Sequence, residues 1–182
     1  MKKQKRVLLQ VTQLGHKILR KKAEQVINIR NIETQTLIDD LTATVMDVDG
    51  VGISAPQVYR SLRLFIMASH PNPRYPNAPK MKPTAIINPK ILTHSKEKTK
   101  DWEGCLSVPG IRGLISRYSW VEVEYTTREE KSVKRKFKDF LARIFQHESD
   151  HLEGYLFVDR VESSKDFISE KEFQKLIKKK AK

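Results

Sequence analysis

The sequence has little that would cross-link the chain or anchor it in a membrane. Its 182 residues include one cysteine, Cys105, so an internal disulfide is impossible. No apolar run approaches the roughly 20 residues that a membrane-spanning helix requires, and the longest patches, such as residues 62–68, are strand-sized. After the basic N-terminal residues only Val7, Leu8 and Leu9 are apolar, which is too short for a signal-peptide core. We therefore expect a cytoplasmic protein with no membrane partner.

Acidic residues are also scarce. There are 22 Asp and Glu against 35 Lys and Arg, a net charge of +13. This balance suits an anionic partner such as RNA or a ribosome, although a solvated basic surface explains it equally well. Without an internal repeat or linker, the length predicts a single domain over residues 1–182, with a basic helix at about 165–180.

Three segments have helical spacing of apolar residues, at 33–48, 139–154 and 165–180. Thr34 is expected to cap the first helix and Asp139 the second, while Gly154 ends the second. The third helix is expected to turn four apolar side chains inward, Phe167, Phe173, Leu176 and Ile177.

Short alternating or apolar runs predict strands at 62–67, 84–88, 90–93, 120–125, 132–137 and 156–158. The runs at 120–125 and 132–137 are expected to pair as a hairpin. Residues 70–83 contain five prolines and are expected to form a loop. Short strands followed by a buried helix indicate an α+β fold.

The most informative stretch is His147-Glu148-Ser149-Asp150-His151. On a helix, the two histidines lie one turn apart on one face, where both can bind one metal ion, and Glu148 can carry a proton beside it. The alternative is a polar helix with solvated histidines. A catalytic metal site needs a third protein ligand. Cys105, between Gly104 and the turn at Pro109-Gly110, is the candidate, although a lone cysteine is more often a buried hydrophobe.

Three stretches in this order resemble the signature motifs of peptide deformylases. They are Gly50-Val51-Gly52-Ile53-Ser54-Ala55-Pro56-Gln57, Glu103-Gly104-Cys105-Leu106-Ser107 and Gln146-His147-Glu148-Ser149-Asp150-His151. The resemblance covers roughly residues 7 to 160. It implies small antiparallel β-sheets around a central metal-binding helix, followed by a C-terminal helix. It also implies a hydrolase that removes the formyl group from the N-terminal formyl-methionine of newly made polypeptides and releases formate.

The resemblance implies a role for each motif residue. Cys105, His147 and His151 would bind one divalent metal ion, with Fe(II) the expected ion and Zn, Ni or Co as substitutes. Glu148 would be the general base and acid for attack of a metal-bound water on the formyl carbonyl. Gln57 and the backbone N–H of Leu106 would hold the carbonyl oxygen as it becomes an oxyanion. The His and Cys ligands by themselves do not select one metal.

The substrate would be the nascent formyl-methionyl polypeptide. The backbone around Gly52 is expected to pair with it as an added strand. Four apolar residues are expected to line the methionine pocket, with Arg112 at its border: Val51, Leu106, Phe140 and Ile144. For the apolar positions, ordinary core packing is the competing explanation. Residues 70–83 form a longer loop than in compact family members, which suggests a lid or an edge flap.

Two other functions fit parts of the sequence. A metalloprotease would share the metal-binding helix but would not need Cys105. A basic RNA- or ribosome-binding protein with a structural metal would leave Gln57 and Glu148 without a task. The lysine-rich tail at 171–182 has two explanations in turn, contact with the ribosome or a solvated helix that frays at its end.

Overall fold

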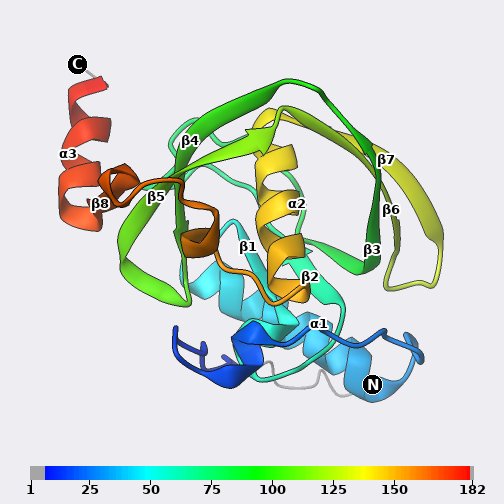
Figure 1. Ribbon diagram of the computed structural model, residues 1–182. Helices are drawn as coiled ribbons and strands as arrows, with labels where there is room; N and C mark the ends of the chain where they lie inside the picture. The colour runs from blue at the N-terminus through cyan, green and yellow to red at the C-terminus, as the bar shows by residue number, and fades with distance from the viewer. Residues whose placement is uncertain (1–6, 181–182) are drawn as a thin grey trace.

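The computed structural model describes residues 7–180, with helix α2, Asp139–Leu152, at its centre (Figure 1). Two antiparallel sheets curve around this helix, one of five strands in the order β1-β2-β3-β6-β7 and one of three in the order β4-β5-β8. The strands are β1 Gly52–Ser54, β2 Leu64–Met67, β3 Thr84–His94, β4 Lys98–Cys105, β5 Val108–Tyr118, β6 Trp120–Thr126, β7 Ser132–Lys138 and β8 Phe167–Ser169. The expected α+β class and the β6–β7 hairpin are confirmed.

Two further α-helices flank this centre, α1 at Ile32–Asp47 and α3 at Glu170–Lys180. Figure 1 shows α1 across the base of the molecule and α3 projecting at the far side of the three-stranded sheet. Four short 3₁₀ helices connect the elements, η1 Lys17–Arg20, η2 Ala55–Val58, η3 Phe157–Arg160 and η4 Ser164–Asp166.

The core holds α2 firmly against the five-stranded sheet. Phe145 of α2 packs edge-on against Phe65 at 5.4 Å between ring centroids and stacks on Phe137 at 5.6 Å. All three side chains are buried, and each contributes about 1.5–3 kcal/mol through its burial. The helix that carries the His-Glu-x-x-His motif is therefore one of the best-packed parts of the fold.

Helix α1 starts earlier than predicted. The side chain of Asn31, not that of Thr34, is the N-cap, and its Oδ1 accepts a hydrogen bond from the Thr34 N–H at 2.7 Å. The hydroxyl of Thr34 instead donates to the carbonyl of Asn28. At the other end, Asp49 adopts the left-handed conformation, with φ of 50°, directly before Gly50.

The start of α2 also differs from the prediction. Asp139 is the first residue of the helix, with φ of 50°, and Lys138 in the N-cap position makes no side-chain capping bond. The reason is that Lys138 still pairs with Trp120 in the β6–β7 hairpin, so the chain passes from strand to helix without a connecting loop. Gly154, with φ of 80°, follows the end of the helix as expected.

The C-terminal third contains two corrections. Residues 156–158 are not a strand, because the chain turns into η3, where Asp159 Oδ2 accepts from the Leu156 N–H at 2.7 Å. The last helix begins at Glu170 because β8 must remain extended to pair with β5. Phe173 is buried, but Phe167 and Leu176 are 37% and 41% exposed, so their expected inward positions were wrong.

The sequence also missed β5 and divided β3 into two strands. Strand β3 is continuous, with an irregularity at Asn88, which has φ of 50° and whose side chain bonds to both backbone polar groups of Val26. The proline-rich residues 70–83 do form a loop. Within residues 7–180, no helix is both long and apolar enough to cross a membrane.

Candidate metal centre and substrate cavity

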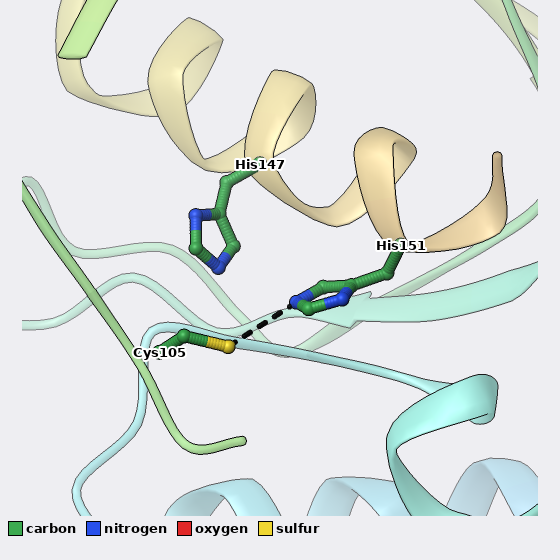
Figure 2. Close-up of side chains that lie close together, drawn as sticks. All are labelled: Cys105, His147 and His151. Carbon is green, nitrogen blue, oxygen red and sulfur yellow. Dashed lines mark hydrogen bonds between the residues drawn. The ribbon is translucent and has the colours of Figure 1, made fainter. Parts of the chain in front are cut away.

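Three side chains from two elements converge beside α2. His147 and His151 project from successive turns of the helix, with ring centroids 5.1 Å apart, and Cys105 faces them from the end of β4 (Figure 2). The Cys105 sulfur lies 3.3 Å from Nε2 of His151, and one ligand atom from each residue lies within 4.8 Å of the others. Two ligands on one tetrahedral metal ion are about 3.5 Å apart, given typical bond lengths. The geometry therefore fits a metal ion.

The backbone around Cys105 gives the sulfur its position. The register of β4 and β5 shifts between Glu103 and Cys105, and the chain then reverses so that Cys105 pairs with Val108. In this turn the Ser107 N–H donates to the Cys105 sulfur at 3.4 Å. The turn thus points the sulfur toward α2 and supplies a donor to it, as a metal-bound thiolate requires.

A buried carboxylate orients His147. Nδ1 of His147 lies 2.9 Å from Oε2 of Glu103, which leaves Nε2 for a metal. Glu103 also binds Arg117 through two hydrogen bonds of 2.9 Å and Arg143 through one of 2.8 Å. Burial favours the neutral acid, but Arg117 and His147 together hold the pKa of Glu103 well below its ordinary value. The carboxylate is therefore a fixed negative charge behind the metal centre.

The two histidines have opposite electrostatic surroundings. Burial opposes protonation of His147, but its bonds to Cys105 and Glu103 raise its pKa well above 6.5. Burial and the neighbouring His147 lower the pKa of His151 well below 6.5. Within the described part of the chain, buried Nδ1 of His151 has no hydrogen-bond partner.

Glu148 lies against the backbone of the first motif. A Cβ atom added to Gly52 would be 2.4 Å from Oε1 of Glu148, so only glycine allows this approach. Glu148 is 4% exposed, and burial raises its pKa to about 7. Its Oε2 is buried without a hydrogen-bond partner among residues 7–180. A carboxylate in this state is suited to taking up and releasing a proton near neutral pH.

The amide of Gln57 has one possible orientation. Its Oε1 accepts from the Ser54 N–H at 2.9 Å, and because a backbone N–H can only donate, the NH₂ group must face the other way. There Nε2 lies 3.4 Å from the Cys105 sulfur and 3.1 Å from the Ser107 hydroxyl. An uncharged donor is therefore aimed at the metal centre.

A cavity of about 400 Å³ opens beside these groups. It is lined by every predicted substrate-binding residue, Val51, Gly52, Arg112, Phe140 and Ile144, and by Gln57, Cys105, Leu106, His147 and Glu148. His151 lies behind the lining and is buried. The apolar lining residues thus border open space and are not solely core packing.

Among the other residues that line the cavity, sequence reasoning missed Arg74, Tyr75, Glu103 and Glu170. Glu103 was part of the quoted second motif, but its bond to His147 depends on the fold. The length of the 70–83 loop was a signal for Arg74 and Tyr75. No local pattern identified Glu170, which reaches the cavity through the pairing of β8 with β5.

Comparison with known proteins places this geometry in a family. The model of the polypeptide deformylase family matches residues 8–167. The chain belongs to the peptide deformylase family. Peptide deformylase 2 of Nostoc sp. is 59% identical over 96% of this chain and 98% of its own. Peptide deformylase 2 of Shewanella oneidensis is 42% identical over 84% and 83%.

Solved peptide deformylases share the fold. The Met-Ala-Ser-bound class I type b enzyme of Acinetobacter baumannii superposes with a TM-score of 0.83 at 46% identity, covering 85% of this chain and 99% of the other. A peptide deformylase of Synechococcus elongatus, solved in complex with actinonin, gives 0.78 at 33% identity, covering 89% and 85%. The predicted function is confirmed: the protein is a metal-dependent hydrolase that removes the N-terminal formyl group from nascent polypeptides.

Proposed function

We propose that Cys105, His147 and His151 hold the catalytic metal ion and that Glu148 is the general base and acid of the deformylation. The observation that carries this proposal is the approach of the three ligand atoms to within 4.8 Å beside a buried carboxylate that borders the cavity. When bound, a divalent ion supplies Lewis acidity and lowers the pKa of water toward roughly 7. Fe(II) is the proposed ion, and metal analysis of anaerobically purified protein tests that choice.

Side-chain and backbone groups of the protein then transfer the proton of the attacking water and stabilise the carbonyl oxygen. Glu148, held beside Gly52, accepts the proton of the attacking water at its carboxylate and donates it to the departing amine of methionine. Gln57 Nε2 and the backbone N–H of Leu106 donate to the carbonyl oxygen as negative charge develops on it. One donor of this kind contributes about 2.7–4 kcal/mol to the stability of the transition state.

The two sheets provide a place for the peptide. Strand β1 is at the edge of one sheet and β4 at the edge of the other, and residues of both line the cavity. A formyl peptide can therefore add as a strand beside Gly52. The methionine side chain would then lie against Val51, Phe140 and Ile144, with Arg112 farther out.

The test is formate release from formyl-Met-Ala-Ser by iron- or nickel-loaded protein. Glu148→Gln should lower kcat by at least about 100-fold, because general acid–base catalysis typically contributes 10²–10⁴-fold. Glu33→Gln, which changes an exposed carboxylate in the first turn of α1, should leave kcat unchanged. A fully active Glu148→Gln variant would contradict the proposed role.

Ribosome contact and a cytoplasmic location remain proposals, as does the single-domain organisation. The lysines of α3 at 171, 175, 178 and 179 are exposed, which supports an anionic partner, whereas residues 181–182 of the predicted tail lie outside the described residues. Lys178→Glu/Lys179→Glu should reduce co-sedimentation with ribosomes. Unchanged co-sedimentation would exclude this surface.

A further inference from the structure

Arg112 borders the cavity, yet its charge is covered. The side chain is 1% exposed because Glu170, from the start of α3, lies against it. Nε of Arg112 donates to Oε2 of Glu170 at 2.7 Å and Nη2 donates to Oε1 at 3.1 Å. This two-bond pairing is the geometry in which a guanidinium and a carboxylate bind most strongly and specifically.

Two aromatic residues also contact the guanidinium of Arg112. Nη1 of Arg112 donates to the Tyr75 hydroxyl at 3.1 Å, and the guanidinium carbon lies 3.9 Å from the centroid of the Phe173 ring. The Tyr75 ring in turn packs on Phe140 at 5.0 Å. One arginine thus joins the proline-rich loop, strand β5 and helix α3 into the outer wall of the cavity.

Glu170 lies beyond the residues that match the family model, which end at 167. Its carboxylate is held in place from within its own helix as well, because Gln174 Nε2 donates to Oε1 at 2.8 Å. The side chain that neutralises Arg112 therefore comes from outside the motif-bearing part of the chain. Its presence sets the charge of the wall separately from the catalytic residues.

The position of Arg112 indicates which part of a peptide would meet that wall. Its Cγ and Cζ atoms would lie 3.5 Å from a Cβ added to Gly104, the residue directly before the metal-binding Cys105. An extended peptide advances about 3.3 Å per residue. The second and third residues of a formyl peptide whose formyl group is at the metal centre are thus within reach of Arg112.

We propose that Glu170 is a specificity-determining residue, which neutralises Arg112 so that the cavity does not favour formyl peptides with an acidic second or third residue. The inference rests on the proposed function. Without Glu170, the guanidinium of Arg112 would add its charge to that of Arg74, which also lines the cavity. An unpaired guanidinium would attract a carboxylate about 8 Å away strongly enough to change binding by about 10-fold or more.

The test compares kcat/KM for formyl-Met-Asp-Ala, formyl-Met-Lys-Ala and formyl-Met-Ala-Ala, with the charged residue also moved to the third position. Glu170→Gln keeps the shape of the side chain and removes its charge. It should raise the Asp/Lys ratio of kcat/KM about 10-fold, at least at one of the two positions, mainly through KM. A purely structural role of Glu170 would change kcat/KM by the same factor for all three peptides.

Two control variants isolate the cause. Glu172→Gln removes the same charge from the same helix, but among residues 7–180 the carboxylate of Glu172 pairs only with exposed Lys175, so the Asp/Lys ratio should stay as in wild type. Glu170→Gln/Arg112→Gln removes the unmasked cation, so the ratio should return toward that of wild type. An unchanged ratio in Glu170→Gln, or an equal shift in Glu172→Gln, would overturn the proposal.

The outcomes also separate this inference from the proposed function. If wild-type protein releases no formate from any peptide, the proposed function has failed; formate release with an unaltered ratio refutes the role of Glu170 alone. Detachment of α3 in the variant would expose Arg112 by a structural route, so a changed ratio supports the proposal only while α3 stays attached, and detachment overturns it. Trp102, 6.4 Å from the Phe173 ring, reports such detachment by fluorescence.

Discussion

Replacing Gly52 by alanine should lower the catalytic rate and leave the free energy of unfolding almost unchanged. The added Cβ would lie 2.4 Å from Oε1 of Glu148, whereas ordinary van der Waals contact begins at 3.4 Å, so the carboxylate must move by about 1 Å. A misplacement of this size can cost about 100-fold in rate, or about 2.7 kcal/mol. Gly52 does not have a positive φ, so alanine fits the backbone there. Since the end of a side chain can move at little cost, stability should change by less than about 1 kcal/mol.

Gly104→Ala is the matched control, because Gly104 also lies in a motif beside the cavity. Its added Cβ would meet Arg112 no closer than 3.5 Å, an ordinary contact. We expect kcat for formyl-Met-Ala-Ser to fall about 100-fold in Gly52→Ala and less than about 3-fold in Gly104→Ala, with metal content and Tm near wild type in both. Near-normal kcat in Gly52→Ala, or an equal loss of kcat in Gly104→Ala, would refute the claim that Gly52 is needed to position Glu148.

Three other perturbations give distinct readouts. Gln57→Glu keeps an oxygen acceptor but loses the amide donor, so kcat should fall at least about 100-fold; a smaller loss would argue against an oxyanion contact. Glu103→Gln weakens a buried charge network and should cost about 3–5 kcal/mol in urea unfolding; a cost below 1 kcal/mol would contradict the network's structural role. Burial favours the neutral form of Glu170, but its hydrogen bonds hold its pKa below 4.5. Its ion pair with Arg112 therefore stabilises α3 fully above pH 4.5, and this stabilisation is lost as the pH falls through the lowered pKa. The fluorescence of Trp102 in a Trp120→Phe background should shift over this acid range and not above it.

The site residues that the sequence predicted are those that lie in short motifs of recognisable chemistry. Two histidines four residues apart must share a helix face, and a lone cysteine among glycine and turn residues was a plausible third ligand. Glu170 carries no such signal. It reaches the cavity only because residues 167–169 add to β5, whereas the sequence placed residues 167–169 in a helix and left β5 unassigned.

The errors in the fold have the same origin. Residues 156–158 have the apolar composition of a strand, but a bond from the Leu156 N–H to Asp159 forms a turn there. The 165–180 segment has helical spacing throughout, yet pairing with a neighbouring strand outweighs that preference for its first residues. Local patterns established the central helix and the β6–β7 hairpin. They failed at the turn between Leu156 and Asp159, and for β8, whose partner strand β5 is more than 50 residues away.

The outer wall around Arg112 has a consequence for inhibitors. A compound that contacts only Cys105, His147 and Gln57 meets residues inside the 8–167 region that matches the family model. One that extends to Tyr75 and Glu170 meets a side chain contributed by a helix beyond that region. Selectivity among peptide deformylases can therefore be sought in contacts with Tyr75 and Glu170.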